Sequence, residues 1–331
     1  MIALRARTIA DLFAPWAGDK PLFHPAHRYF RTRAMQNSTI SGTLSRSQML
    51  GERTLSGVGL AVASICTIQV GAALSAPLIR ELGAAQVTWF RMGFSALILL
   101  VWIRPRIFAY SAAQWRAVVL LGLANAAMTF LFAMALQRIP LALTVATEFL
   151  GPLFIAAVGL RGWRAVLLPL LALAGVVLLV GFGDMSATDV AGILCALGAG
   201  VGWGSYIILT KRIGTAFAGL EGLVMPFTIA ALVLTPFGVA TLGTPVSLGT
   251  LAMCFGLAVL SPLIPYAFEL NALRRLSQGT FGILMSLEPA VGAIAGYFIL
   301  AQAMGAAQMA GIGMVVIASV AAALGEAKGR A

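Results

Sequence analysis

Two short stretches, Thr147-Glu148-Phe149-Leu150-Gly151-Pro152 and Ser286-Leu287-Glu288-Pro289, each place a glutamate just ahead of a proline inside a long apolar run. A carboxylate in hydrocarbon is unfavourable by about 3 kcal/mol or more, so it is retained mainly where it pairs, titrates or meets a polar cargo. The two stretches lie in corresponding parts of the two halves of the chain. This arrangement predicts a polar pathway through a membrane.

The composition supports a membrane protein. Of 331 residues, 60% are hydrophobic and 10% charged, with a mean hydropathy of +0.96, whereas about 25% of the residues of a soluble protein are charged. The net charge is +11 and the pI is about 10.6. The basic residues stand at the ends of apolar runs instead of forming a stripe with interleaved aromatics. They are therefore expected in cytoplasmic loops, and no nucleic-acid partner is predicted.

The polar and sulfur-containing residues show no pattern typical of an enzyme. Cys66, Cys195 and Cys254 fall inside apolar runs without a CxxC pair, and His24 and His27 lie in the polar N-terminal region. No metal site and no cofactor is predicted. No Walker pattern, nucleophile elbow or HExxH motif is present, so we expect neither catalysis nor ATP-driven transport.

Apolar runs broken by charge, glycine or proline predict ten helices, at 57–77, 84–102, 116–136, 141–160, 165–182, 190–209, 218–240, 249–272, 278–299 and 304–324. Each is close to the roughly 20 residues needed to cross the hydrocarbon core. The predicted fold is therefore all-α, a polytopic membrane protein. Residues 1–56 form a polar, basic tail that we expect to be cytoplasmic and disordered, and residues 325–331 a cytoplasmic C-terminal tail. Whether residues 1–50 belong to the native protein is open, because Met35 and Met49 precede the same core.

Arginine and lysine in the connections predict that both termini are cytoplasmic. With the N-terminus inside, the outside loops contain only Arg80 and Arg138. The inside connections and the C-terminal tail then contain Arg104, Arg106, Arg161, Arg164, Lys211, Arg212, Arg274, Arg275, Lys328 and Arg330.

The two halves of the chain, 57–182 and 190–324, resemble each other in register. Ala135-Leu136-Gln137-Arg138 matches Ala272-Leu273-Arg274-Arg275, and at the same offset Pro152 matches Pro289. Five helices per half is an odd number, so the second copy enters the membrane from the opposite side. The sequence therefore predicts two inverted five-helix repeats, a plan that many secondary transporters share.

Four prolines are predicted to interrupt helices and act as hinges. Pro152 cannot donate a hydrogen bond to the carbonyl of Glu148, and Pro289 cannot donate to that of Met285. Pro262 and Pro265 break the helix at 249–272 near its middle. Interrupted helices at matching positions of two halves point to a central binding site.

The two glutamates are the leading candidates for proton coupling or for binding an amine. The alternative for each is a static pair with a buried arginine or a hydrogen-bonded neutral acid. Glu269 ranks below them because it lies near Arg274 and Arg275. Arg91, inside the helix at 84–102, is a candidate for a substrate carboxylate; it could instead snorkel outward or pair with a glutamate.

Five further polar or aromatic residues within predicted spans are expected to line a cavity. Each could instead make an interhelical hydrogen bond or belong to an interfacial belt. They are Gln69, Asn125, Trp203, Tyr206 and Tyr266.

Several stretches resemble the EamA-type exporters of the drug/metabolite transporter superfamily, most closely those that export threonine and homoserine. They are Ser64-Ile65 through Gln69-Val70-Gly71, Ala142–Pro152 (ALTVATEFLGP), Ala196–Tyr206 (ALGAGVGWGSY) and Pro265–Pro289 (PYAFELNALRRLSQGTFGILMSLEP). The resemblance spans about residues 57–324. It implies a ten-helix inverted repeat in the bacterial inner membrane and proton-coupled efflux of small amino acids. Two features depart from the family: Ala301-Gln302 stands where Gly-Glu is frequent, and the basic N-terminal tail is long.

The sequence therefore predicts a secondary exporter with a small-molecule substrate, protons and the lipid bilayer as partners. Export of an aromatic amino acid, a purine-like metabolite or a cationic drug is the main alternative. A channel, a membrane enzyme and a purely structural membrane protein fit less well. The oligomeric state is left open.

Overall fold

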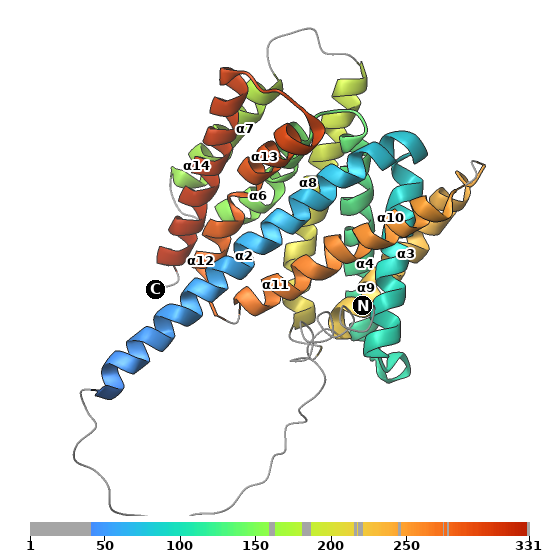
Figure 1. Cartoon of the computed structure of the whole chain (residues 1–331). Coiled ribbons are helices and arrows are strands. Elements are labelled where there is room, and N and C mark those ends of the chain that lie inside the picture. The colour runs from blue at the N-terminus through green and yellow to red at the C-terminus, as the bar shows by residue number, and fades with distance from the viewer. Residues whose placement is uncertain are drawn as a thin grey trace, which may run out of the picture.

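The computed structural model describes residues 41–158, 163–180, 187–214, 217, 221–243, 246–273, 275–276 and 278–329. Within these residues all regular elements are helices (Figure 1). Eight helices are long and apolar enough to cross a membrane, and two shorter apolar helices, Val166–Val180 and Ala306–Ala322, occupy the remaining predicted spans. The predicted all-α, polytopic fold is confirmed.

The first half of the chain contains α2 (Ser41–Leu82), α3 (Ala84–Ile103), the short 3₁₀ helix η2 (Ile107–Ala109), α4 (Ala112–Leu136), α5 (Leu141–Glu148), α6 (Leu150–Val158) and α7 (Arg164–Val180). The second half contains α8 (Ala187–Gly214), α9 (Glu221–Val239), α10 (Leu248–Ala258), the π-helical turn η3 (Val259–Leu263), α11 (Ile264–Leu273), α12 (Gln278–Met285), α13 (Glu288–Leu300) and α14 (Ala306–Gly329). Three spans consist of more than one helix: α5 with α6, α10 with η3 and α11, and α12 with α13.

The helices at both ends of the chain are longer than predicted. Residues 1–40 of the predicted tail lie outside the described residues, but 41–56 belong to α2, which extends well beyond the bundle (Figure 1). Likewise α14 continues to Gly329, inside the predicted C-terminal tail. Low hydropathy marks the end of the membrane-spanning part, whereas the helix itself can continue beyond it, because its hydrogen bonds lie within its own backbone.

Prolines interrupt the fourth and ninth spans at the predicted places. The carbonyl of Glu148 has no amide partner at Pro152, and α5 ends at Glu148. In the ninth span α12 ends at Met285, and α13 begins at Glu288 with Pro289 in its first turn. Each break leaves a glutamate at a helix end deep in the bundle.

The eighth span is interrupted as well. Within η3, Ser261 has extended backbone angles (φ −155°, ψ 105°), and Pro262 follows it. The matching span of the first half, α4, is one continuous helix. The two halves therefore differ at this point, although their sequences keep a common register.

The helix contacts between the two halves are related by exchanging one half for the other. α2 contacts α11, and the equivalent helices of the opposite halves, α8 and α4, also contact each other. In the same way the contact of α2 with α13 is matched by the contact of α8 with α5. In three further pairs, a helix contacts its own equivalent in the other half: α3 with α9, α5 with α13 and α7 with α14. Every one of these pairs joins one half to the other, as the predicted inverted repeat requires.

The outer surface of the bundle carries apolar side chains. Leu170, Leu173 and Val177 of α7 are 53%, 48% and 48% exposed. Exposed apolar surface of this extent is unfavourable in water and suits contact with lipid tails.

A close approach of α6 to α8 holds the fourth span beside its break. A methyl group at Gly151 would overlap the carbonyl group of Gly200, and one at Gly200 would lie 2.7 Å from the carbonyl oxygen of Glu148. Only a residue without a side chain fits at this crossing.

We therefore expect Gly151→Ala to destabilise the protein by about 3 kcal/mol, because the added methyl group must push the two backbones apart. Thermal unfolding in detergent measures this. Gly93→Ala is the matched control: Gly93 is also within a helix, but no heavy atom lies within 4 Å of the position of an added methyl group. Equal melting temperatures for the two variants would contradict the close packing.

Candidate functional site

Glu148 and Glu288 lie at the interface between the two halves. Glu148 is the last residue of α5, Glu288 is the first of α13, and these helices pack against each other. The two side chains are 8% and 2% exposed. The helix breaks thus bring two acids, far apart in sequence, to one buried region.

No hydrogen bond or ion pair reaches either of these two carboxylates within the described residues. Oε1 of Glu288 is buried and has no hydrogen-bond partner. Glu288 lies near enough to Glu148, and to Glu269 of α11, for their charges to interact. Within the described residues, neither Glu148 nor Glu288 therefore forms the static pair with a buried arginine that was the alternative. The result is a group of three acids, which we call the acid cluster: Glu148, Glu269 and Glu288.

Glu269, which the sequence analysis ranked below the other two acids, lies near Glu288 in the structure. Its Oε1 accepts a hydrogen bond of 3.0 Å from the hydroxyl of Ser64 on α2, and Ser64 is fully buried. The sequence analysis ranked Glu269 lower because Arg275 is near it in sequence. In the structure Arg275 donates a hydrogen bond to the hydroxyl of Ser56 at 2.9 Å. Arg274 lies outside the described residues. A single serine in an apolar run gives no signal by which this contact could have been found.

Aromatic side chains from α8 and α11 adjoin the acid cluster. The ring of Trp203 stands edge-on to Phe149, which follows Glu148, with centroids 5.5 Å apart. Tyr206 and Tyr266 are 6.3 Å apart in a similar arrangement, and Tyr206 is in electrostatic contact with Glu269. Tyr206 and Tyr266, which the sequence analysis singled out separately, therefore meet near Glu269, and Trp203 packs on the residue that follows Glu148.

Arg91 contacts the broken eighth span. Its Nη2 donates to the carbonyl oxygen of Ser261 at 2.8 Å, while its Nε is buried without a partner. Within the described residues Arg91 pairs with no glutamate. Ser261 has extended backbone angles at the kink, so its carbonyl is turned out of the helical hydrogen-bond ladder, and the guanidinium supplies its donor.

The same face of α3 also contacts a second carbonyl at the kink. Pro262 cannot donate to the carbonyl of Ala258. The hydroxyl of Ser95 donates to the carbonyl of Arg91 at 2.7 Å and lies 3.3 Å from the Ala258 oxygen. Arg91 and Ser95 are four residues apart, one above the other on the helix. Together they join α3 to the kink of the eighth span, which gives Arg91 a structural role that the sequence analysis did not anticipate.

Gln69 and Asn125 are each 2% exposed. Oε1 of Gln69 lies 3.1 Å from where a methyl group on Gly292 would be, one turn beyond Glu288 in α13, and has no hydrogen-bond partner. Nδ2 of Asn125 also lacks a partner, but no described contact connects Asn125 to the acid cluster. Gln69 therefore lies beside the helix that carries Glu288. The position of Asn125 does not support its predicted role in lining the binding cavity.

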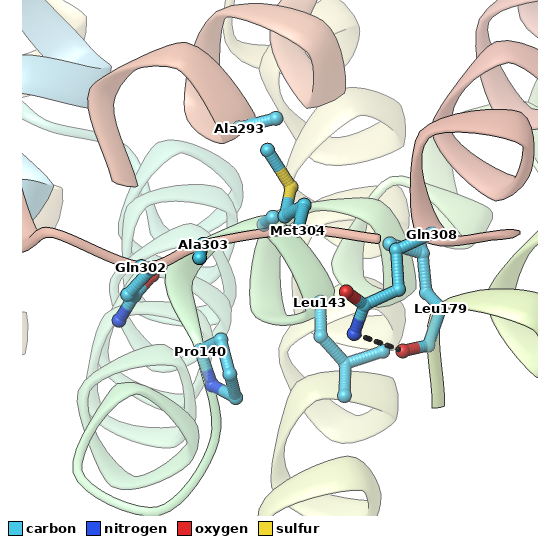
Figure 2. Close-up of a pocket in the computed structure, with 9 residues that line it drawn as sticks. Pro140, Leu143, Leu179, Ala293, Gln302, Ala303, Met304 and Gln308 are labelled. Atoms are coloured by element: carbon cyan, nitrogen blue, oxygen red, sulfur yellow. Dashed lines mark hydrogen bonds between the residues drawn. The ribbon is translucent and has the colours of Figure 1, made fainter. Parts of the chain in front are cut away.

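A small cavity lies beyond the acid cluster, between α5 and α13. It has a volume of about 50 Å³, and its walls include Leu143 and Ala293, each five residues from a cluster glutamate (Figure 2). Neither Glu148 nor Glu288 belongs to this wall. The described histidines, cysteines and acids also form no group of three that could hold a metal ion.

Comparison with known proteins places the chain among transporters. The model of the EamA-like transporter family matches residues 190–324. The threonine/homoserine exporter RhtA of Salmonella typhimurium (strain LT2) is 34% identical over 263 residues, which cover 79% of this chain and 89% of that protein. RhtA of Escherichia coli K12 is 33% identical with the same coverage. The uncharacterized transporter YwfM of Bacillus subtilis is 26% identical over 68% of this chain and 79% of that protein.

One solved crystal structure superimposes with a TM-score of 0.54 at 19% sequence identity, covering 84% of this chain and 99% of that chain. At this level of identity the likeness shows a shared fold alone.

The contact between α3 and the kink leads to a stability test. We expect Arg91→Met to destabilise the protein by about 2 kcal/mol, because the buried carbonyl of Ser261 loses its donor. Thermal unfolding in detergent measures this, with Gly93→Ala on the same helix as the control. An unchanged melting temperature in Arg91→Met would contradict the structural role of the guanidinium.

Proposed function

The chain belongs to the EamA-like transporter family, and on that premise we propose that it is a secondary active exporter of small amino acids such as threonine and homoserine, coupled to protons. The chain covers 89% of the length of RhtA from two enteric bacteria, and those relatives are threonine/homoserine exporters by name. The observation that supports the proposal best is the acid cluster at the interface of the halves, where neither Glu148 nor Glu288 has a described partner.

The chemistry of the cluster suits an exchange of protons for an amine. Three carboxylates close together in a low-dielectric region cannot all be ionised without a compensating cation. A substrate ammonium group can supply that positive charge, and so can protons. Because the two compete for the same carboxylates, binding one releases the other, which is the requirement for proton-coupled export.

The position of the acids supports a mechanism of alternating access. The halves 57–182 and 190–324 are the bodies that rock against each other, and the cluster lies between them. Pro152, Pro289, Pro262 and Pro265 stand at the broken spans, where fewer backbone hydrogen bonds resist bending. Rocking would expose the cluster to each side of the membrane in turn.

Arg91 is the proposed partner of the substrate carboxylate. Its Nε is a buried donor without a partner, and a carboxylate accepts from a guanidinium through two parallel bonds. In the described conformation Nη2 is engaged by Ser261. Substrate binding at Arg91 would therefore weaken the link between α3 and the kinked span, and so connect occupancy to bending.

A second cargo class is favoured by the aromatic residues. Trp203, Tyr206 and Tyr266 adjoin the acids, and aromatic faces bind organic cations and planar rings. An aromatic amino acid, a purine-like metabolite or a cationic drug would use these side chains more fully than threonine does.

The proposed location is the bacterial inner membrane, with both termini cytoplasmic. The orientation is supported by the distribution of arginine and lysine among the connections.

We expect Glu148→Gln and Glu288→Gln each to reduce proton-driven efflux at least about tenfold, because an amide cannot exchange a proton or neutralise an ammonium group. Efflux of labelled threonine from proteoliposomes under an imposed pH gradient measures this. Glu81→Gln is the control, since Glu81 is exposed at the end of α2. Full activity in both single variants, at normal protein levels, would reject the role of the acids.

Direct competition identifies the cargo. Proteoliposomes are loaded with labelled threonine, homoserine or an aromatic amino acid, and initial efflux rates are compared. We expect threonine and homoserine to leave faster than the aromatic compound. Faster efflux of the aromatic compound, or resistance of overproducing cells to cationic drugs alone, would favour the second cargo class.

A further inference from the structure

The connection between α13 and α14, residues 301–305, crosses one end of the bundle, and we call it the strap (Figure 1). The strap belongs to the second half of the chain. Gln302 in the strap and Gln308 in the first turn of α14 each form a hydrogen bond to a helix end of the first half.

Gln302 makes the first contact. Its Oε1 accepts a hydrogen bond of 3.1 Å from the backbone amide of Leu141, the first residue of α5. The first amides of a helix have no partner within the helix, so this bond satisfies a donor that would otherwise be free. The backbone of Gln302 is held in turn, because its amide donates to the carbonyl of Gly296 in α13 at 3.1 Å.

Gln308, just after the strap, makes the second contact. Its Nε2 donates to the carbonyl oxygen of Leu179 near the end of α7 at 3.4 Å (Figure 2). Its Oε1 accepts from the backbone amide of Gly305 at 3.0 Å, which fixes the end of the strap. The strap is therefore joined to both α5 and α7, the second more weakly than the first.

The small cavity lies under the strap. Gln302, Ala303 and Met304 form one side of it, and Leu143 and Ala293 another (Figure 2). Five residues of helix correspond to about 7.5 Å of rise, so the cavity lies along both helices between the strap and the acid cluster. Anything leaving the cluster between α5 and α13 toward this end must pass below the strap.

We propose that Gln302 is a positioning residue that keeps this end of the transport path closed, and that the path opens when its bond to the first turn of α5 breaks. The role of this closure in transport rests on the proposed function, whereas the closure itself can be tested without transport. The bond crosses from one half to the other, so rocking of the halves cannot open this end while the bond holds.

The local backbone is built around this contact. Ala301 ends α13 with a left-handed conformation (φ 54°), which turns the chain so that Gln302 points back over α13. A methyl group at Gly296 would lie 2.9 Å from Oε1 of Gln302 and displace it. The glutamine amide is neutral, so its bond to the α5 amide is weaker than that of a carboxylate would be.

The opposite end of the bundle is joined by different groups. Oε1 of Glu221 accepts from the backbone amide of Arg106 at 3.1 Å and from the hydroxyl of Tyr110 at 3.4 Å. Burial and the neighbouring Glu221 raise the pKa of Tyr110 to about 12, so the hydroxyl keeps its proton and remains a donor. Hydrogen bonds thus connect the two halves at both ends of the bundle. The bond at the opposite end involves the carboxylate of Glu221, whereas the bond of Gln302 to α5 involves no charged group.

Accessibility of the cavity wall tests the proposal. The three native cysteines are replaced by alanine (Cys66→Ala, Cys195→Ala and Cys254→Ala), and Ala293→Cys is added, a small change at a position that is 3% exposed. The rate of labelling with a hydrophilic maleimide is measured in detergent, without substrate or gradient. We expect Gln302→Ala to raise this rate about fivefold, as for the loss of one hydrogen bond.

Three variants separate the possible outcomes. Gln302→Glu keeps an acceptor and adds favourable charge at the start of α5, so its rate should equal or fall below that of the parent. Gln308→Ala should have a smaller effect than Gln302→Ala. Gln137→Ala, at an exposed glutamine that ends α4, is the matched control and should leave the rate unchanged.

An unchanged rate in Gln302→Ala would overturn the proposal, and so would an equal increase in Gln302→Glu. Labelling does not require transport, so it distinguishes failure of the closure from failure of the proposed function. If labelling follows the expected order while no variant exports threonine, the closure stands and the cargo assignment falls.

Discussion

The backbone of a helix has to find every hydrogen-bond partner within the protein when it crosses hydrocarbon, and this constraint shapes the whole structure. Proline violates it locally, because it withholds an amide from the carbonyl four residues before it. In the eighth span Arg91 and Ser95 of α3 contact the carbonyls of Ser261 and Ala258 at the kink. A broken helix therefore survives in this bundle only where a neighbouring helix provides donors or packs closely against the break.

The same constraint locates the candidate site. Broken spans must lie inside the bundle, away from lipid, and here the fourth and ninth spans meet at the interface of the two halves. Glu148 and Glu288 stand at the ends of their helices at these breaks. The acid cluster thus lies where the broken fourth and ninth spans meet.

The two halves are not equivalent in detail. The third span is the continuous α4, whereas the matching eighth span is kinked at η3. The strap connects the second half to α5 and α7, and Glu221 connects α9 to the first half at the other end. The two ends of the bundle are therefore joined by chemically different contacts.

Hydrophobicity, charge and proline determined the spans, the helix breaks and the position of both central glutamates along the chain, because these properties act over a few residues. The helix at 41–56 was missed, since low hydropathy says where a membrane ends and nothing about where a helix does. Tertiary structure alone decided that Glu269 joins the cluster through Ser64, that Arg91 contacts Ser261, and that Gln302 contacts α5. Each of these contacts joins residues more than 150 positions apart, and only the packing of one half against the other brings such residues together.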